Sequence, residues 1–416
     1  MPAGFKAYGQ ILGDPRNRAF SGAGFVARLP LSMTGVGIVL LVSLTNGSFG
    51  RAGLITAVST LIGAASAVAW GRVIDRVGQA RVLVSAAIVC FVGIGVLIAS
   101  VVLAWPLAAS LAAAVVVGLG FSSAGSSVRA RWSYRLRGTP LLNTAYAVEA
   151  VLEEVIFIVG PLLVTFLATA VHPALGLGAT AVLGLLGAVL LAAQRDTEPP
   201  VQPRTERHKT GPLPVRVLLP VAMAGAALGA VFGGMEVVVV AFAQERGLLP
   251  YAGLLLTAWA IGSLVAGVVT GSIEWRATPA VRFRVGAGLL AGSLVPLPFV
   301  DDPLLLAVLL TLSGIAIAPT LIAAVGVTQA AVDQSRLTEA LAWNSTGIAS
   351  GVALGAAVLG YVIDANDARA GFIGVVGAGV LLVLAALFVR ASPTAAAPLS
   401  PEPAETPAVE REPRPG

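Results

Sequence analysis

The sequence predicts an all-α integral membrane protein with twelve transmembrane helices, arranged as two pseudo-symmetric six-helix bundles. The 416 residues are 57% hydrophobic and 11% charged, with a mean hydropathy of +0.90. Charge-free apolar windows recur along the chain at lengths near the roughly 20 residues that cross a bilayer. A polar stretch near the middle of the chain separates six of the expected spans from the other six.

The composition excludes the soluble classes of protein. Ordinary soluble domains carry about a quarter charged residues, more than twice the share in this chain. A soluble enzyme, a nucleic-acid binder and a disordered scaffold are therefore excluded. The basic pI of about 9.9 is interpreted as a topology signal and not as a nucleic-acid surface. With one cysteine, Cys90, and two distant histidines, we expect no disulfide framework, no metal site and no cofactor.

Eleven charge-free windows predict the twelve spans. Residues 82–128 form the longest window, which is long enough for two spans, and Trp105 and Pro106 form a natural break inside it. The windows are Leu29–Gly50, Ala52–Gly71, Val82–Val128, Val155–Val171, Pro173–Gln194, Val217–Met235, Leu248–Ile273, Val285–Val300, Pro303–Val332, Ala340–Ile363 and Ala370–Val389.

Basic residues predict the orientation of these spans. With the N-terminus in the cytoplasm, 22 of the 26 Lys and Arg residues fall on the cytoplasmic side. Only Arg51, Arg246 and Arg369 fall outside, and Arg28 lies within the first span. Such a bias is typical of the positive-inside rule. We therefore expect a multi-pass protein of the plasma (inner) membrane with both termini in the cytoplasm.

The polar segments set the expected domain boundaries. The stretch before the second half is rich in Pro, Arg, Glu and Thr, which is typical of a flexible linker, and the end of the chain is rich in Pro, Ala and Glu, which is typical of disorder. The expected parts are a cytoplasmic N-terminal tail (1–18), an N-terminal bundle (19–194), a cytoplasmic linker (195–214), a C-terminal bundle (215–391) and a disordered cytoplasmic tail (392–416).

The two halves also repeat each other. Residues 52–54 and 252–254 both read Ala-Gly-Leu at the start of a span, and each span ends at a glycine, Gly71 or Gly271. The offset is the same at both ends, which favours an internal duplication.

A charged motif follows the second span, where residues 71–83 read GRVIDRVGQARVL. Gly71 permits close helix approach. Asp75, near a helix end, can accept hydrogen bonds from the positive N-terminus of another helix. Arg76 and Arg81 balance its charge. The alternative is a loop that only maintains topology.

Twelve spans in two halves with G-x-x-x-D-R-x-G after the second span resemble the major facilitator superfamily. Gly71, Asp75, Arg76 and Gly78 fall on the family's loop motif, and Arg81 supplies a further basic residue. The resemblance implies that this cluster latches the first bundle to the N-terminal end of the eleventh span, near Thr338 and Glu339. It also implies a secondary transporter in which two bundles rock around a central cavity.

The sequence departs from the family pattern at several positions. Gln79 and Ala80 stand where the family usually has basic residues, and the equivalent loop of the second half reads GSIEWR. Residues 111–120, in the fourth span, lack the arginine of many drug–proton antiporters. The Gly-Pro signature of their fifth span is reduced here to a fragment that contains Gly160 and Pro161. These two residues are interpreted as a helix kink.

Several ionisable residues lie within expected spans. Glu149, Glu153 and Gly160 share one face of the fifth span, and Glu154 lies on its flank. Arg28 lies at a similar depth, so a pair with Glu153 or Glu149 is expected. Because intramembrane charges are expensive, they indicate either a substrate or proton site or an ion pair that locks two helices.

Two further candidates lie in the second half. Glu236 follows two glycines in the seventh span, which suggests a loosened helix that could gate; counting from Arg216 places it near the outer side. The alternative is an interfacial carboxylate already in water. Asn344 stands at the repeat position of Glu149 and is expected to bind a ligand or a neighbouring helix.

The expected function is secondary active transport by alternating access. No nucleotide-binding or hydrolytic motif is present in the sequence, so an enzyme is not expected. We expect the energy to come from an ion gradient or from the substrate's own gradient, with the proton as the favoured ion. Few polar residues in the spans favour export of a small amphipathic or apolar organic compound. The alternatives are an importer or uniporter of a small metabolite, and a non-transporting receptor or scaffold. The expected partners are this small-molecule substrate, the proton and the lipid bilayer, for a monomer that does not bind nucleic acid.

The basic-residue bias makes a testable prediction of topology. A reporter fused after Arg390 should lie in the cytoplasm, and a cysteine at Asp302 should react with an impermeant maleimide added outside intact cells. The reverse labelling pattern would overturn the orientation and move the motif loop to the outside.

Overall fold

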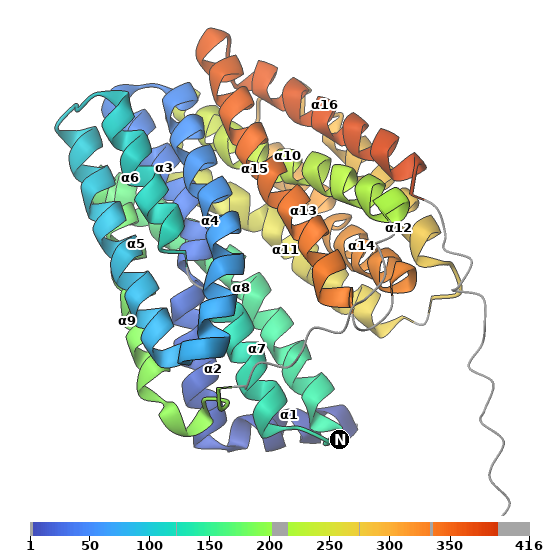
Figure 1. The fold of residues 1–416 in the computed structure, drawn as a ribbon. Coiled ribbons are helices and arrows are strands. Elements are labelled where there is room, and N and C mark those ends of the chain that lie inside the picture. Colours follow the sequence, from blue (N-terminus) through green and yellow to red (C-terminus); the bar gives the residue numbers. More distant parts are fainter. Residues whose placement is uncertain (1–2, 122, 202–214, 274, 333–335, 390–416) are drawn as a thin grey trace, which may run out of the picture.

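The structure is a computed structural model that describes residues 3–121, 123–201, 215–273, 275–332 and 336–389. Within these residues, twelve helical segments are long and apolar enough to cross a membrane, as expected from the sequence (Figure 1). The α-helices are α1 (Ala3–Gly13), α2 (Pro15–Arg28), α3 (Pro30–Asn46), α4 (Phe49–Val77), α5 (Gln79–Val102), α6 (Leu107–Leu119), α7 (Ala124–Arg135), α8 (Leu141–Ala170), α9 (Pro173–Ala193), α10 (Val215–Glu245), α11 (Ala252–Ser272), α12 (Pro279–Leu294), α13 (Pro303–Gly314), α14 (Ile317–Ala331), α15 (Leu337–Ala365) and α16 (Ala368–Leu387). Three short 3₁₀ helices are η1 (Arg195–Thr197), η2 (Leu249–Tyr251) and η3 (Leu297–Phe299).

The first span begins earlier than the sequence indicates. It runs over Pro15–Asn46 and joins α2 to α3 at Leu29, where Pro30 begins the second helix. The expected tail, residues 1–18, contains α1 and the start of α2, and its residues 1–2 lie outside the described part. Residues 202–214 of the expected linker and the expected tail 392–416 also lie outside it.

Asp14 begins α2 and ties it to the fourth span. Its side chain accepts the backbone N–H of Arg16 at 2.8 Å and pairs with Arg135 of α7 at 2.6 Å. The hydrogen bond from Arg16 and the charge of Arg135 hold the pKa of Asp14 below its ordinary value. This contact stays ionised and intact at neutral pH and is lost in acid.

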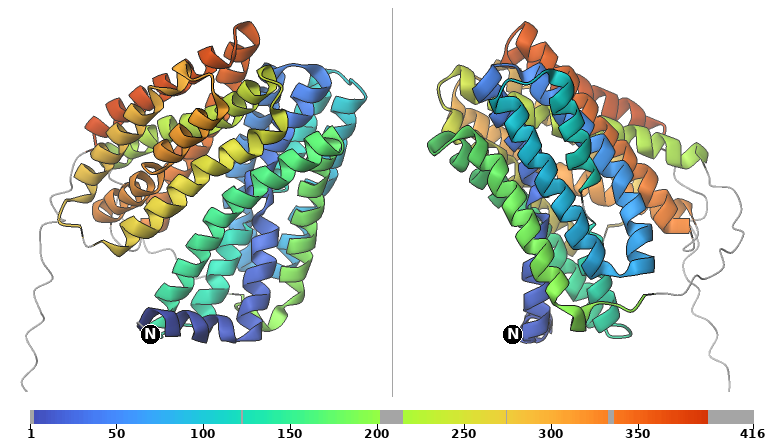
Figure 2. Two further views of the ribbon diagram at one scale, coloured as in Figure 1. Left: turned by 180° about the vertical axis from the view of Figure 1, so that it is seen from behind. Right: turned by 60° about the vertical axis from the view of Figure 1, so that its left-hand side comes forward.

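The two halves of the molecule form a wedge. The side on which α1 lies is called the α1 side, and the opposite side is called the far side. Near the far side the halves meet through α4 with α15, α8 with α11, and α3 with α10. Toward the α1 side the helices of the two halves diverge (Figures 1 and 2).

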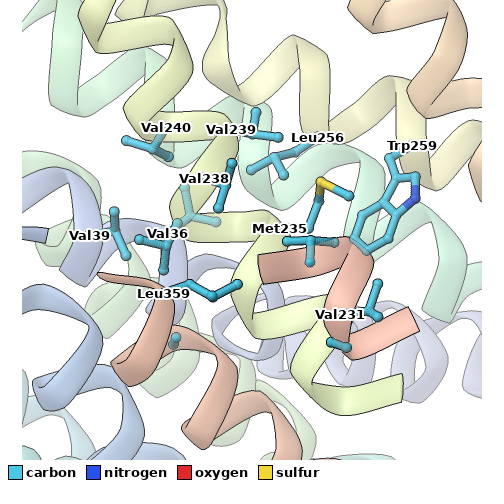
Figure 3. Close-up of a cluster of buried hydrophobic side chains, with 14 of the residues drawn as sticks. Val36, Val39, Val231, Met235, Val238, Val239, Val240, Leu256, Trp259 and Leu359 are labelled. Carbon is cyan, nitrogen blue, oxygen red and sulfur yellow. The ribbon is translucent and has the colours of Figure 1, made fainter. Parts of the chain in front are cut away.

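Apolar side chains fill the junction between the halves. Val36 and Val39 of α3 lie near Leu359 of α15, and Met235 of α10 lies beside Trp259 of α11 (Figure 3). All five side chains are buried. Their burial removes apolar surface of both halves from water at the junction.

The C-terminal half is organised around two glycine-rich helices, α10 and α15. Gly229 and Gly233 of α10 face the backbone of α15 at Ile348 and Val352, and Gly351 of α15 faces the backbone of α10 at Ala226. A Cβ atom at any of these glycines would overlap the opposite main chain. Small residues here let the two helices pack backbone to backbone.

Candidate functional site

A buried ion pair joins the first and fifth spans. Arg28, at the end of α2, donates from Nη2 to Oε2 of Glu149 in α8 at 2.5 Å, and the two side chains are 5% and 0% exposed. Ser21 donates to the other carboxylate oxygen of Glu149 at 2.6 Å and the indole of Trp132 donates to it at 2.8 Å. The sequence left Glu153 and Glu149 as possible partners of Arg28. The structure pairs Arg28 with Glu149, whose carboxylate also accepts hydrogen bonds from Ser21 and Trp132.

Glu153, one turn along α8, has a different environment. It pairs with Arg129 of α7 at 2.5 Å, and both side chains are partly exposed. Glu153 and Arg28 also line a cavity of about 120 Å³ inside the N-terminal half, whose wall includes Phe121 and Thr180. The cavity is large enough to admit water, so it can hydrate the side chains of Glu153 and Arg28.

Glu154 lies on the flank of α8, as the helical spacing predicts, and is partly buried. Among the described residues it makes no ion pair or side-chain hydrogen bond. Gly160, on the face of Glu149, packs against Ser32 of α3 so closely that a Cβ would overlap the Ser32 hydroxyl. Pro161 lies inside α8, which continues past it to Ala170.

Glu236 lies between the two halves. A Cβ built on Gly35 of α3 would stand 2.6 Å from its Oε2 atom and 3.8 Å from the methyl group of Thr56 in α4. No described residue donates to the Glu236 carboxylate or pairs with it, and the hydroxyl of Thr56 is also buried without a partner. Glu236 stands nine residues before the end of α10, about 13 Å inside it. It is therefore deeper than an interfacial residue.

Asn344 of α15 is 7% exposed. A Cβ built on Gly225 of α10 would stand 2.8 Å from its Oδ1 atom, so Asn344 faces its neighbour within the C-terminal half. Its side chain makes no hydrogen bond with the other described residues. The sequence-based prediction that it serves a ligand or a neighbouring helix stays open.

The motif loop is held in place by residues of the N-terminal half, to which it belongs. Gly78 ends α4 with φ of 95°, a left-handed conformation that favours glycine. Glu198, beyond α9, accepts the backbone N–H groups of Gln79 and Ala80 at 2.5 and 3.1 Å and thereby caps α5. Sequence reasoning missed Glu198 because a lone carboxylate in a polar segment carries no signal until its partner is known.

The charged residues of the motif are free in this conformation. Among the described residues, Asp75, Arg76 and Arg81 make no ion pair or side-chain hydrogen bond, and nothing lies within 4 Å of a Cβ built on Gly71. Glu339, at the start of α15, pairs with Arg336 at 2.9 Å. Among the residues that the structure describes, the latch that the family resemblance implies is therefore not formed.

Sequence reasoning also missed Arg131 of α7, which is fully buried. Its Nε atom donates to the side chain of Gln79 at 2.9 Å, and its Nη1 atom donates to the carbonyl of Gln194 and the hydroxyl of Thr197 at 2.8 and 2.7 Å. Arg131 thus holds the end of α9 against the motif loop. Within the described residues, no group of three or more His, Cys, Asp or Glu side chains could hold a metal ion.

The comparison with protein-family models decides the family. The model of the Major Facilitator Superfamily matches residues 20–303 and 251–414, which together span nearly the whole chain. The chain belongs to the Major Facilitator Superfamily. It is accordingly a multi-pass membrane protein of a family of transporters, as the motif loop and the twelve spans predicted.

Solved structures of superfamily transporters share its fold. The nucleoside transporter NupG is 14% identical, with a TM-score of 0.71 over 89% of this chain and 98% of that one. A POT family transporter in complex with 5-aminolevulinic acid is 12% identical, with a TM-score of 0.68 over 89% and 94%. The human organic anion transporter MFSD10 (TETRAN) is 15% identical, with a TM-score of 0.61 over 91% and 100%. The comparison with curated proteins found no match.

The two carboxylates of α8 should differ sharply in their effect on stability. Glu149→Gln leaves Arg28 buried without a counter-charge and should destabilise the folded protein by about 3–5 kcal/mol. Glu153→Gln disrupts a partly exposed pair and should have an effect below about 1 kcal/mol. Thermal melting of the two purified variants in detergent would measure the difference. Equal melting temperatures would show that the Arg28 pair is not needed for folding.

Proposed function

We propose that this superfamily member exports a small amphipathic or apolar organic compound in exchange for protons, by alternating access. The observation that carries the proposal is Glu236, a carboxyl group without a partner among the described residues, between two halves that meet on the far side and diverge on the α1 side. A group in this place can exchange protons with water whenever the wedge opens around it.

Glu236 fits the role of proton carrier better than the carboxylates of α8. Glu149 already has Arg28 and two further donors, and Glu153 has Arg129, so each can remain charged throughout a cycle. Glu236 has no such compensation among the described residues. An uncompensated carboxylate inside a bilayer is costly, and binding a proton removes that cost.

We infer the direction of transport from the orientation of the protein in the membrane, and the kind of cargo from the side chains between the two halves. The basic-residue bias places the α1 side in the cytoplasm, so the open wedge would receive its cargo from inside the cell. The side chains at the closed end are mainly apolar, with Trp259 and Met235 among them. Such a lining suits an apolar or amphipathic compound better than a sugar or an ion.

Import or uniport of a small metabolite is the second candidate. It is favoured by the fold neighbours, which are named as nucleoside and peptide transporters among others. Asn344 would then serve a polar substrate. Proton-coupled export and proton-coupled import differ in the polarity of the pH gradient that drives accumulation of the compound.

The role of Glu236 can be tested after a thermal-shift screen of small organic compounds has identified a ligand of the purified protein. In proteoliposomes, Glu236→Gln should still bind the compound and exchange it down its own gradient, because binding does not need the proton. It should lose accumulation driven by a pH gradient. Glu153→Gln, the matched control, should retain it.

Unchanged pH-driven accumulation by Glu236→Gln would move the proton site elsewhere, with Glu153 as the next candidate. Accumulation only under a pH gradient of the opposite polarity would favour import. Absence of flux for the wild-type protein under any gradient would favour the receptor or scaffold.

The motif loop makes a separate prediction. We expect Asp75 to bind the N-terminal end of α15 when the wedge closes on the α1 side. Asp75→Asn should insert and fold normally but transport more slowly, because a neutral side chain interacts less with a helix N-terminus. Initial rates of wild-type and variant protein at equal amounts in the membrane would measure this. Equal rates would leave the loop a topological role only.

A further inference from the structure

The carboxylate of Asp364 joins the two halves of the molecule on the far side. Asp364 stands at the end of α15, in the C-terminal half, and binds the first turn of α4, in the N-terminal half. Its Oδ2 atom accepts the hydroxyl of Ser48 at 2.7 Å and the backbone N–H of Gly50 at 2.9 Å, and its Oδ1 atom accepts the N–H of Phe49 at 2.7 Å. All three bonds therefore run from one half of the molecule to the other.

Close packing surrounds these hydrogen bonds. A Cβ on Gly50 would stand 2.6 Å from the ring of Tyr361, and Gly53 and Gly360 each face the main chain of the opposite helix too closely for any side chain. The first turn of a helix has N–H groups without intrahelical partners and a partial positive charge. Asp364 satisfies two of these groups and supplies the complementary charge, so the contact combines shape and electrostatics.

The same two helices carry the motif loop at their other ends. Asp75 stands two residues before the end of α4, as Asp364 stands one residue before the end of α15. Each helix thus offers an aspartate to the first turn of the other, on opposite sides of the molecule. On the far side the bonds are made, and on the α1 side Asp75 makes none with the described residues.

We propose that Asp364 is a gating residue, whose three bonds must break when the far side opens, so that it sets the balance between the two conformations of the transporter. Donor and acceptor atoms stand within 3 Å of one another, and any separation of the halves at this point breaks all three bonds together. Asp75 and Asp364 then act in opposition, each stabilising closure of its own side.

A matched control lies three residues away. Asp367 accepts the N–H of Ala370 at 2.8 Å and caps α16, but this bond stays within the C-terminal half. It has the same chemistry on the same side of the molecule and does not join the halves. A purely local capping role predicts similar behaviour for Asp364→Ala and Asp367→Ala, whereas gating predicts a difference.

The experiment measures the two openings directly. In a Cys90→Ser background, nitroxide labels at Leu103→Cys and Leu304→Cys report the far side, and labels at Tyr134→Cys and Val281→Cys report the α1 side. These four side chains are exposed. Pulsed electron–electron distance distributions of the full chain in nanodiscs, without substrate or gradient, give the ratio of the two conformations. The proposal depends on alternating access but not on proton coupling or cargo, so failure of either leaves this measurement unaffected.

Asp364→Ala should raise the ratio of far-side-open to α1-side-open molecules about tenfold, the size expected for loss of a helix cap. Adding Asp75→Asn should partly reverse the shift, and Asp367→Ala should leave the ratio unchanged. If Asp364→Ala does not fold, Asp364→Asn, which keeps one acceptor oxygen, should give a smaller shift in the same direction. A folded Asp364 variant with the wild-type ratio, or an equal shift in Asp367→Ala, would overturn the proposal.

Discussion

The structure depends on one constraint: a bilayer offers no hydrogen-bond partners, so every polar group inside it must find one in the protein. The backbone meets this constraint by forming helices. Glu149 meets it with three donors from two neighbouring helices, α2 and α7, and its counter-ion Arg28 also donates to a carbonyl of its own helix. Where a carboxyl group inside a span has no partner among the described residues, as at Glu236, the exception points to a group whose charge changes.

Span number and fold class could be predicted from the sequence because apolar length is a local property of the chain. The same holds for the break at Trp105 and Pro106, which the structure places between α5 and α6. The choice of ion-pair partner is not a local property, because it depends on how distant segments of the chain pack together. Glu149 and Glu153 lie on one face of α8, and only the positions of α2 and α7 decide that the former receives Arg28 and the latter Arg129.

The depth of a residue in the membrane was harder to predict than the span to which the residue belongs. The distance of Glu236 from Arg216 suggested the outer edge, yet α10 continues nine residues beyond Glu236 and α3 covers it. Arg131, Glu198 and Asp364 carried no signal at all. They lie at or beyond span ends, where charged residues are ordinary, and only the helix ends or loops that they bind distinguish them from solvated side chains.

The glycine contact between α10 and α15 has a mechanical consequence. Because the two backbones touch at Gly229, Gly233 and Gly351, no layer of flexible side chains lies between them to absorb a displacement. We therefore expect the two helices to move as one rigid unit, with Glu236 on one helix and Asp364 near the end of the other. A tilt that begins at Glu236 would then also displace Asp364, and so couple the centre of the molecule to its surface.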